Sequence, residues 1–115
     1  MDTVVVSLAG EITQGQPLQV IAEEVTLPSQ LIDPERELLY RVAKKMFGAV
    51  KGDYLIVELR TRAHTGELVL VSIEERMYLG RWWGKHKKRE LQDNAGKTLF
   101  TNPTVVGVVN LIARF

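Results

Sequence analysis

The chain contains no cysteine and only two histidines, His64 and His86, among its 115 residues. The absence of cysteine excludes disulfide bonds and thiolate metal sites. Both histidines stand in polar surroundings, so the sequence predicts no structural zinc site. We therefore expect a protein that holds neither a metal nor a cofactor.

Long apolar runs and a strong net charge are also missing. No apolar run approaches the roughly 20 residues that a membrane-spanning helix needs. The first 12 residues lack a basic start before their apolar stretch and carry Asp2, which argues against a signal peptide. The formal net charge of +1 gives no overall reason to expect a nucleic acid or an anionic membrane as partner. We therefore expect a cytoplasmic protein without membrane contact.

What is present suits one globular domain. Hydrophobic residues make up 45% of the chain and charged residues 25%, which is ordinary for a domain with a modest core. No internal repeat or low-complexity linker interrupts the sequence. We therefore expect a single domain over residues 1–115, with no helix-turn-helix domain.

From Tyr54 onward, short segments enriched in β-branched and aromatic residues alternate with polar or glycine-containing turns. Strands at this spacing are typical of a compact, mainly antiparallel β fold. The valine-rich residues 3–9 predict a further strand or an ordered arm. The strands expected in the second half are 54–57, 67–73, 77–83, 97–100 and 105–112.

Residues 34–47 have the pattern of one short helix in this β fold. Asp33 suits the N-cap position, and Pro34 suits the first helical position. Apolar residues then recur at helical spacing as far as Phe47, and Gly48 can end the helix. The local pattern therefore predicts a helix within 34–47.

The order of several short motifs resembles the C-terminal domain of LexA and the related UmuD proteins, a family of self-cleaving Ser-Lys peptidases. Residues 8–18 resemble the segment that carries the cleaved bond, with Gln14 and Gly15 in the place of the usual Ala-Gly pair. The resemblance implies a LexA C-terminal-domain-like (signal-peptidase-like) β fold, with a strand at about 38–43 instead of a helix. The other matching segments are 23–28, 41–42, 52–57, 66–73 and 106–115.

The two residues that perform catalysis in that family are missing from this sequence. The family uses a serine nucleophile activated by a neutral, desolvated lysine. Here Lys45 and Gly80 occupy the nucleophile and base positions, and no serine lies between Ser29 and Ser72. Arg81 follows the base position, but an arginine stays protonated and cannot act as this base. The resemblance therefore implies a fold without its catalyst and no enzymatic activity.

A second constellation is the stretch 80–89, which combines several cations with two tryptophans. In a functional interpretation, this stretch forms a surface that binds nucleic acid or an acidic partner, and the tryptophan rings stack on bases. As a purely structural feature, it is a β-hairpin loop with one tryptophan in the core and the cations in solvent. We favour the structural interpretation. The residues of the possible partner surface are Arg81, Trp82, Trp83, Lys85, Lys87, Lys88 and Arg89.

The C-terminal run 105–112 is apolar without alternation. This pattern predicts burial on both faces, or burial on one face and an interface on the other. In the LexA family the C-terminal region contributes to homodimer pairing, whereas core packing in a monomer explains the same run. We favour a homodimer, because an unpaired apolar edge invites association. The expected interface residues are Val105, Val106, Val108, Val109, Leu111 and Ile112.

The function that these features imply is a dimerising regulatory domain, of or derived from a LexA-type transcriptional repressor, that does not cleave itself. Such a protein would contact DNA only through a domain absent here, so we expect a fragment of a repressor or a free-standing protein. Three alternatives stand beside it. One is a free-standing module that pairs with a LexA/UmuD-family protein or another protein of the DNA-damage (SOS) response. The others are a self-cleaving peptidase with an altered dyad, and a single-stranded nucleic-acid binder that uses residues 82–89.

Overall fold

The structure is a computed structural model that describes residues 2–85 and 87–115, and of Lys85 only the backbone. Strands hold 57% of the residues and helix 3%, which confirms the mainly β fold expected from the sequence. In this part of the chain no helix is long and apolar enough to cross a membrane. The elements are β1 (Thr3–Ile12), β2 (Gln16–Pro17), β3 (Glu24–Pro28), the 3-10 turn η1 (Ser29–Leu31), β4 (Glu37–Val42), β5 (Tyr54–Glu58), β6 (Leu68–Ile73), β7 (Arg76–Lys85), β8 (Lys88–Gln92), β9 (Thr98–Thr101) and β10 (Val105–Ala113).

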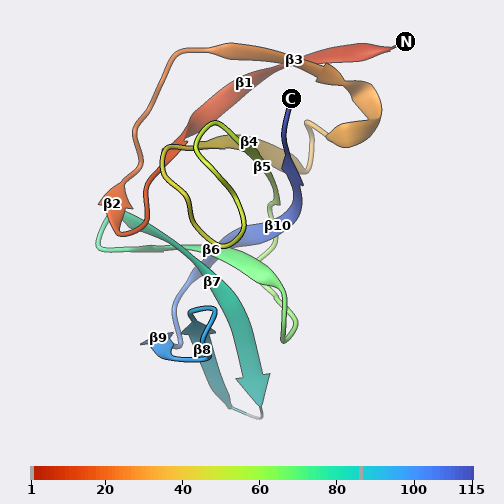
Figure 1. Cartoon of the computed structure of the whole chain (residues 1–115). Coiled ribbons are helices and arrows are strands. Elements are labelled where there is room, and N and C mark those ends of the chain that lie inside the picture. Colours follow the sequence, from red (N-terminus) through yellow and green to blue (C-terminus); the bar gives the residue numbers. More distant parts are fainter. Residues whose placement is uncertain (1, 86) are drawn as a thin grey trace.

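The strands form one continuous path of neighbours, in the order β3-β1-β4-β5-β10-β6-β7-β8-β9, with β2 paired to β7 beside this path. β1 and β4 are parallel, and the other neighbours are antiparallel. β1 and β3 lie at the end of the molecule that holds both termini, whereas the β7–β8 hairpin forms the opposite end (Figure 1). The molecule is therefore elongated, with extents of 44 × 24 × 23 Å.

The helix predicted within 34–47 is absent, and β4 occupies the centre of that segment. The capping signal operates for a single turn only, in which the Asp33 carbonyl accepts a hydrogen bond from the amide of Glu37 (2.8 Å). The chain then extends because β4 fills the place between β1 and β5, where Leu39 is fully buried. Sheet pairing overrides the local helical preference, and the strand is the one that the family resemblance implied at about 38–43.

The strands predicted after residue 54 are present as β5, β6, β7, β9 and β10. β8 was missed, because its charged start at Lys88 and Arg89 has the composition of a solvent-exposed loop. These residues are extended because they complete a hairpin with β7, in which Leu91 stands opposite Trp82. Both of these apolar side chains are buried, so the burial of Leu91 holds a strand whose other residues are polar or charged.

β10 lies between β5 and β6 in the strand order, so the unpaired apolar edge on which we based the expected homodimer is limited to part of this strand. Its first half pairs with β6 and its second half with β5, and Val108 stands opposite both Val69 and Glu58 at the change-over. Val105 and Val108 are buried within the subunit. From Asn110 to the end of the strand, β5 alone supplies register partners among the described residues.

Three clusters of buried side chains follow the sheet from one end to the other. The central cluster joins β4, β5, β6 and β7 with Ile12 and Met46. A second cluster surrounds Trp82 at the hairpin end, and a third packs β1 and β3 against Leu39. The turn that leaves β1 therefore emerges from the central cluster, beside β7.

Candidate functional site

The turn that contains Gln14 and Gly15 lies against the edge of β7. The Gly15 amide donates to the Met77 carbonyl (2.8 Å), and β2 then pairs with the first residues of β7. The guanidinium of Arg76 donates to the Gly15 carbonyl (3.0 Å). The pair that stands in the place of a cleaved bond is thus held on the sheet.

The side chain of Gln14 also holds this turn on β7. Its Nε2 donates to the Leu79 carbonyl and its Oε1 accepts from the Leu79 amide, both at 2.8 Å. β2 covers this edge of β7 at residues 76–77, and β8 covers it from Arg81 on. The side-chain amide, which offers one donor and one acceptor like a peptide group, fills the gap between the two strands.

Beyond the turn, the chain returns close along β1. The Glu11 amide donates to the Gln19 carbonyl (2.8 Å), and the Gln19 amide donates back to the Glu11 carbonyl (3.1 Å). A Cβ atom on Gly10 would lie 2.7 Å from Cδ1 of Leu18 and 2.8 Å from the carbonyl oxygen of Gln19. Glycine at position 10 is therefore required for this close approach.

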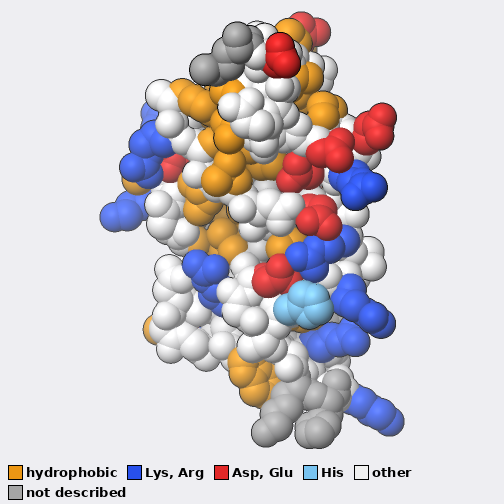
Figure 2. Space-filling view, turned by 90° about the vertical axis from the view of Figure 1, so that its right-hand side faces the viewer, with side chains coloured by type: hydrophobic (Ala, Val, Ile, Leu, Met, Phe, Trp, Pro, Cys, Tyr) orange, Lys and Arg blue, Asp and Glu red, His pale blue; other side chains and the backbone are white. Residues whose placement is uncertain are grey.

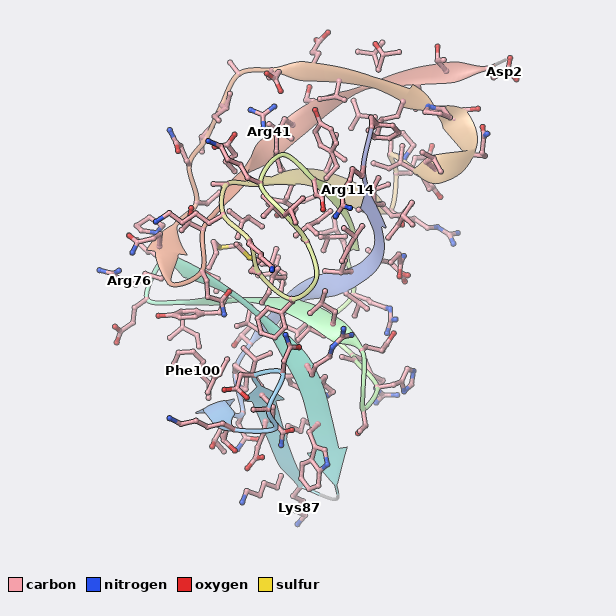
Figure 3. The ribbon with its side chains drawn as sticks, in the orientation of Figure 1. Asp2, Arg41, Arg76, Lys87, Phe100 and Arg114 are labelled. Carbon is pink, nitrogen blue, oxygen red and sulfur yellow. The ribbon has the colours of Figure 1, made fainter. Side chains whose placement is uncertain are left out.

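Arg41 ties the end of this returning segment to β4 (Figure 3). Its Nε lies 2.7 Å from Oε2 of Glu11, and its Nη1 pairs with Glu23. The hydrogen bond with Glu11 is the main cause that raises the pKa of the Arg41 guanidinium above its usual value. The segment between Glu11 and Glu23 is thus held at both ends.

Position 80, where the resemblance places the catalytic base, has no room for a side chain. A Cβ atom on Gly80 would lie 2.5 Å from Cγ of Leu91 and 2.9 Å from the carbonyl oxygen of Gln92. Leu91 packs into the space in front of this glycine and is fully buried there. The neighbouring Leu79 packs into the central cluster, so the strand presents apolar groups where the family carries its lysine.

Position 45, where the resemblance places the nucleophile, lies in the turn between β4 and β5. Met46 and Ala49 close this turn with two backbone hydrogen bonds of 3.0 and 2.8 Å, and both side chains are buried. Lys45 itself is exposed. No hydrogen bond joins a serine to a lysine among the described residues, and the three serines, Ser7, Ser29 and Ser72, are all exposed.

An ion pair between the buried Asp53 carboxylate and the exposed Arg114 side chain also holds this turn. The carboxylate of Asp53 receives two hydrogen bonds from the Arg114 guanidinium, each of 2.8 Å, and one of 2.9 Å from the Val50 amide. The Arg114 hydrogen bond is the largest cause that lowers the pKa of Asp53 to about 2. This contact joins the end of β10 to the β4–β5 turn.

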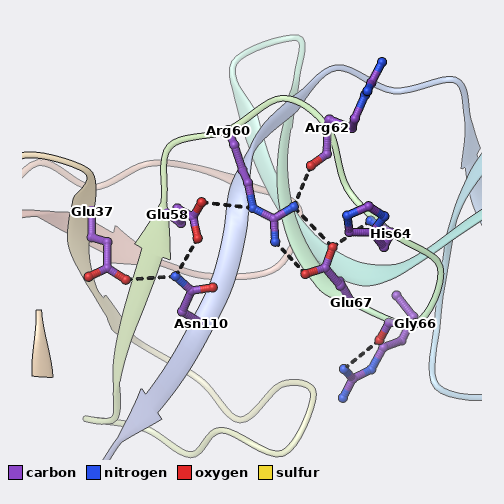
Figure 4. Close-up of polar contacts among 9 residues, drawn as sticks. Glu37, Glu58, Arg60, Arg62, His64, Gly66, Glu67 and Asn110 are labelled. Atoms are coloured by element: carbon purple, nitrogen blue, oxygen red, sulfur yellow. Dashed lines mark hydrogen bonds and ion pairs between the residues drawn. The ribbon is translucent and has the colours of Figure 1, made fainter. Parts of the chain in front are cut away.

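A second ion network shapes the loop between β5 and β6 (Figure 4). Arg60 lies between Glu58 (3.1 Å) and Glu67 (2.6 Å), and its Nη1 also donates to the Arg62 carbonyl (2.6 Å). The hydrogen bond with Arg60 lowers the pKa of Glu67, and the same bond raises the pKa of Arg60. Within the described residues no three His, Asp or Glu side chains are grouped as metal ligands, so we interpret this network as structural.

The expected dimer residues divide between core and surface. Val105 and Val108 are buried in the subunit, whereas Leu111 is 38% exposed. Beside the second half of β10 lies a cavity of about 310 Å³, bordered by residues 109–112 and by Glu67 and Arg81. Only this half of the strand retains an open edge in the part of the chain that the structure describes.

The expected partner surface also divides, because β7 turns successive side chains to opposite faces. Trp82 is buried, its neighbour Trp83 is half-buried on the other face, and Arg81 lies beside β10. Lys88 pairs with Glu90 at 3.4 Å. Lys87 and Arg89 are exposed beside a cavity of about 600 Å³, and His86 and the side chain of Lys85 lie outside the described residues.

No protein-family model and no curated protein matches this chain. The resemblance to LexA and UmuD therefore rests on the motifs of the sequence alone. The role of the Gln14 side chain was not predictable from the sequence, since no local signal marks a glutamine that pairs with a strand 65 residues further on. The pairing of Asp53 with Arg114 was not predictable for the same reason.

Proposed function

We propose that the chain is a non-catalytic, dimerising regulatory domain, of or derived from a LexA-type repressor. The observation that carries the proposal is the mutual hydrogen bonding of Gln14 and Leu79 on β7. This contact holds the cleavage-like turn against the strand on which the family carries its base. A turn held in this way suits a permanent part of the fold better than a segment that is cut and released.

The two catalytic positions support a domain that does not cleave itself. Leu91 fills the space that a side chain at position 80 would need. Lys45 extends into solvent, and an exposed lysine does not replace a serine hydroxyl as nucleophile. Neither position supplies a group that attacks the bond between Gln14 and Gly15.

The second half of β10 supports the dimerisation part of the proposal. Residues 110–113 keep an open backbone edge beside the exposed Leu111 side chain. Two copies of this edge, related by a two-fold axis, can pair antiparallel and satisfy each other's backbone groups. The interface is then the end of the strand rather than the full run from Val105.

Incubation at alkaline pH, followed by intact mass measurement, tests the absence of cleavage, because high pH deprotonates the lysine of an active family member. We expect the full-length mass after prolonged incubation, for the wild type and for Lys45→Ala alike. A product that ends at Gln14, formed by the wild type and missing from Lys45→Ala, would overturn the proposal.

Sedimentation at about 10–50 µM tests the dimer, since this range suits an interface of moderate affinity. Leu111→Lys should yield monomers, because the lysine places two like charges across the two-fold axis. Leu59→Lys is the matched control, since Leu59 is also exposed but lies outside β10. A monomeric wild type, or equal dissociation of both variants, would remove the basis for the dimer.

A further inference from the structure

Two cavities meet around Trp82 at the hairpin end of the molecule. One, of about 350 Å³, lies under the β5–β6 loop, and the other, of about 600 Å³, lies between β8 and the start of β10. Both are lined by Trp82, Arg89 and Thr61, so they form one hollow. We name it the basic groove and define it by Thr61, Arg62, His64, Trp82, Lys87 and Arg89.

The basic groove has positive charges that no acid compensates. No carboxylate lines either cavity, and Arg62, Lys87 and Arg89 have no acidic partner within 4.0 Å among the described residues. The nearby acids are engaged elsewhere, Glu67 with Arg60 and Glu90 with Lys88. On the face shown in Figure 2, basic side chains lie above, beside and below the histidine, whereas the acidic side chains lie next to it or above it and none lies below it.

The three cations follow one another along the groove. Arg62 lines the first cavity, Arg89 lines both, and Lys87 lines the second. Lys87 lies at the tip of the β7–β8 hairpin (Figure 3). Cations in a row suit the successive phosphates of a polymer, whereas a site for a single phosphate needs cations that converge on one point.

The groove offers little for the recognition of bases or of apolar side chains. Trp82 is only 5% exposed, so its ring cannot serve as a platform on which bases stack. Peptide partners are usually anchored by apolar side chains in pockets, and the lining here is mainly polar and cationic. A sugar-phosphate backbone needs only cations and hydrogen-bond donors.

We propose that the basic groove binds the phosphate backbone of a single-stranded nucleic acid without reading its sequence. A flexible single strand can follow the hollow and bring successive phosphates to the cations along its walls, whereas a rigid duplex would contact these exposed cations only along its straight backbone. The inference is independent of the proposed regulatory function, because the groove shares neither Gln14 nor the open edge of β10. It gives the chain a nucleic-acid contact of its own.

Fluorescence anisotropy of a labelled oligothymidylate tests the proposal. A length of about 12 nucleotides lies within the usual site size of proteins that bind single strands. Contact with three phosphates predicts that log K falls with log salt at a slope of about −2. The charge reversal Arg62→Glu with Arg89→Glu should weaken binding about tenfold or more at low salt. Lys44→Glu with Lys51→Glu, at exposed lysines of the β4–β5 turn, changes the net charge equally and should weaken it less than about twofold.

Three results would overturn the proposal: equal weakening by both pairs of charge reversals, tighter binding of a duplex of the same length, or equally tight binding of a labelled polyglutamate. Equally tight binding of polyglutamate would indicate that the groove binds an acidic protein rather than a nucleic acid. The neutral pair Arg62→Gln with Arg89→Gln provides a second test in case the charge-reversed protein does not fold. It should reduce the salt slope to about one third, because one of three phosphate contacts remains.

Discussion

Along its first half, β7 borders the Gln14 turn, whereas along its second half it borders the basic groove. In the first region the side chain of Gln14 and the backbone of Leu79 satisfy each other's donors and acceptors. In the second region, Lys87 and Arg89 have no acidic partner among the described residues. Polar groups that are paired inside the fold hold its shape, while exposed, unpaired charges add little stability and remain free to bind a ligand.

Gly80→Ala should have the largest effect, because it disrupts the paired region at its tightest point. The new methyl group would lie 2.5 Å from Cγ of Leu91, which is fully buried and cannot withdraw into solvent. We expect the free energy of unfolding to fall by about 3 kcal/mol. Urea denaturation measures this change.

The matched control is Gly84→Ala on the same strand, where the nearest atom to the new methyl group is 3.6 Å away. Its free energy of unfolding should change by less than about 0.5 kcal/mol. Equal stability of the two variants would mean that Leu91 yields easily and that the paired region is softer than its contacts indicate.

Gln14→Ala should have the next largest effect. The change removes both hydrogen bonds to Leu79 and should lower the free energy of unfolding by about 1–3 kcal/mol. Hydrogen exchange at the Leu79 amide should accelerate as well. Gln16→Ala, at an exposed residue of β2, is the control and should leave both quantities nearly unchanged. Unaltered exchange at Leu79 in Gln14→Ala would contradict the role of the amide.

Asp53→Asn should have the smallest effect on stability, and this effect should depend on pH. Hydrogen bonding to Arg114 lowers the pKa of Asp53 from its usual 3.8 to about 2. A lowered pKa contributes stability that is present above the usual value and is lost as the pH falls from 3.8 through about 2. The urea midpoint of the wild type should therefore fall more steeply over that range than the midpoint of Asp53→Asn.

The control for this pH dependence is Glu35→Gln, at an exposed carboxyl. Its urea midpoint should follow the wild type throughout the acidic range. Parallel curves for the wild type and Asp53→Asn would show that the ion pair with Arg114 contributes nothing to stability. The conclusion that polar groups paired inside the fold stabilise it would then apply to the hydrogen bonds of this protein but not to its ion pairs.

Several strands were predictable because their signals are local. β5 and β6 combine branched or aromatic residues with flanking turn residues, and Gly66, between them, adopts a φ of 94° that favours glycine. The interpretation that one of the two tryptophans lies in the core also held, and the structure shows that this residue is Trp82. The absence of a serine between Ser29 and Ser72 and the glycine at position 80 can be read directly from the sequence. Such features depend on residues a few positions apart.

Partners distant in the chain determine the conformation of the segment 34–47. They also determine the positions of the two candidate surfaces, the open edge of β10 and the basic groove. The helical pattern after Asp33 yields to a strand because β1 and β5 leave a place for one. β10 has an open edge over only half of its length because β6 begins beside Val108 and its pairing with β10 extends no further. The basic groove exists because the β5–β6 loop brings Arg62 beside Arg89 of β8.

The amino-acid pattern alone therefore determined that the chain is mainly β, since composition, periodicity and turn chemistry act within a few residues. The order of the strands, the pairing of Gln14 with Leu79 and the gathering of unpaired cations at one end followed only from the folded sheet. Strand order minimises exposed apolar surface and unpaired backbone groups over the whole molecule, and no local window of sequence contains that information.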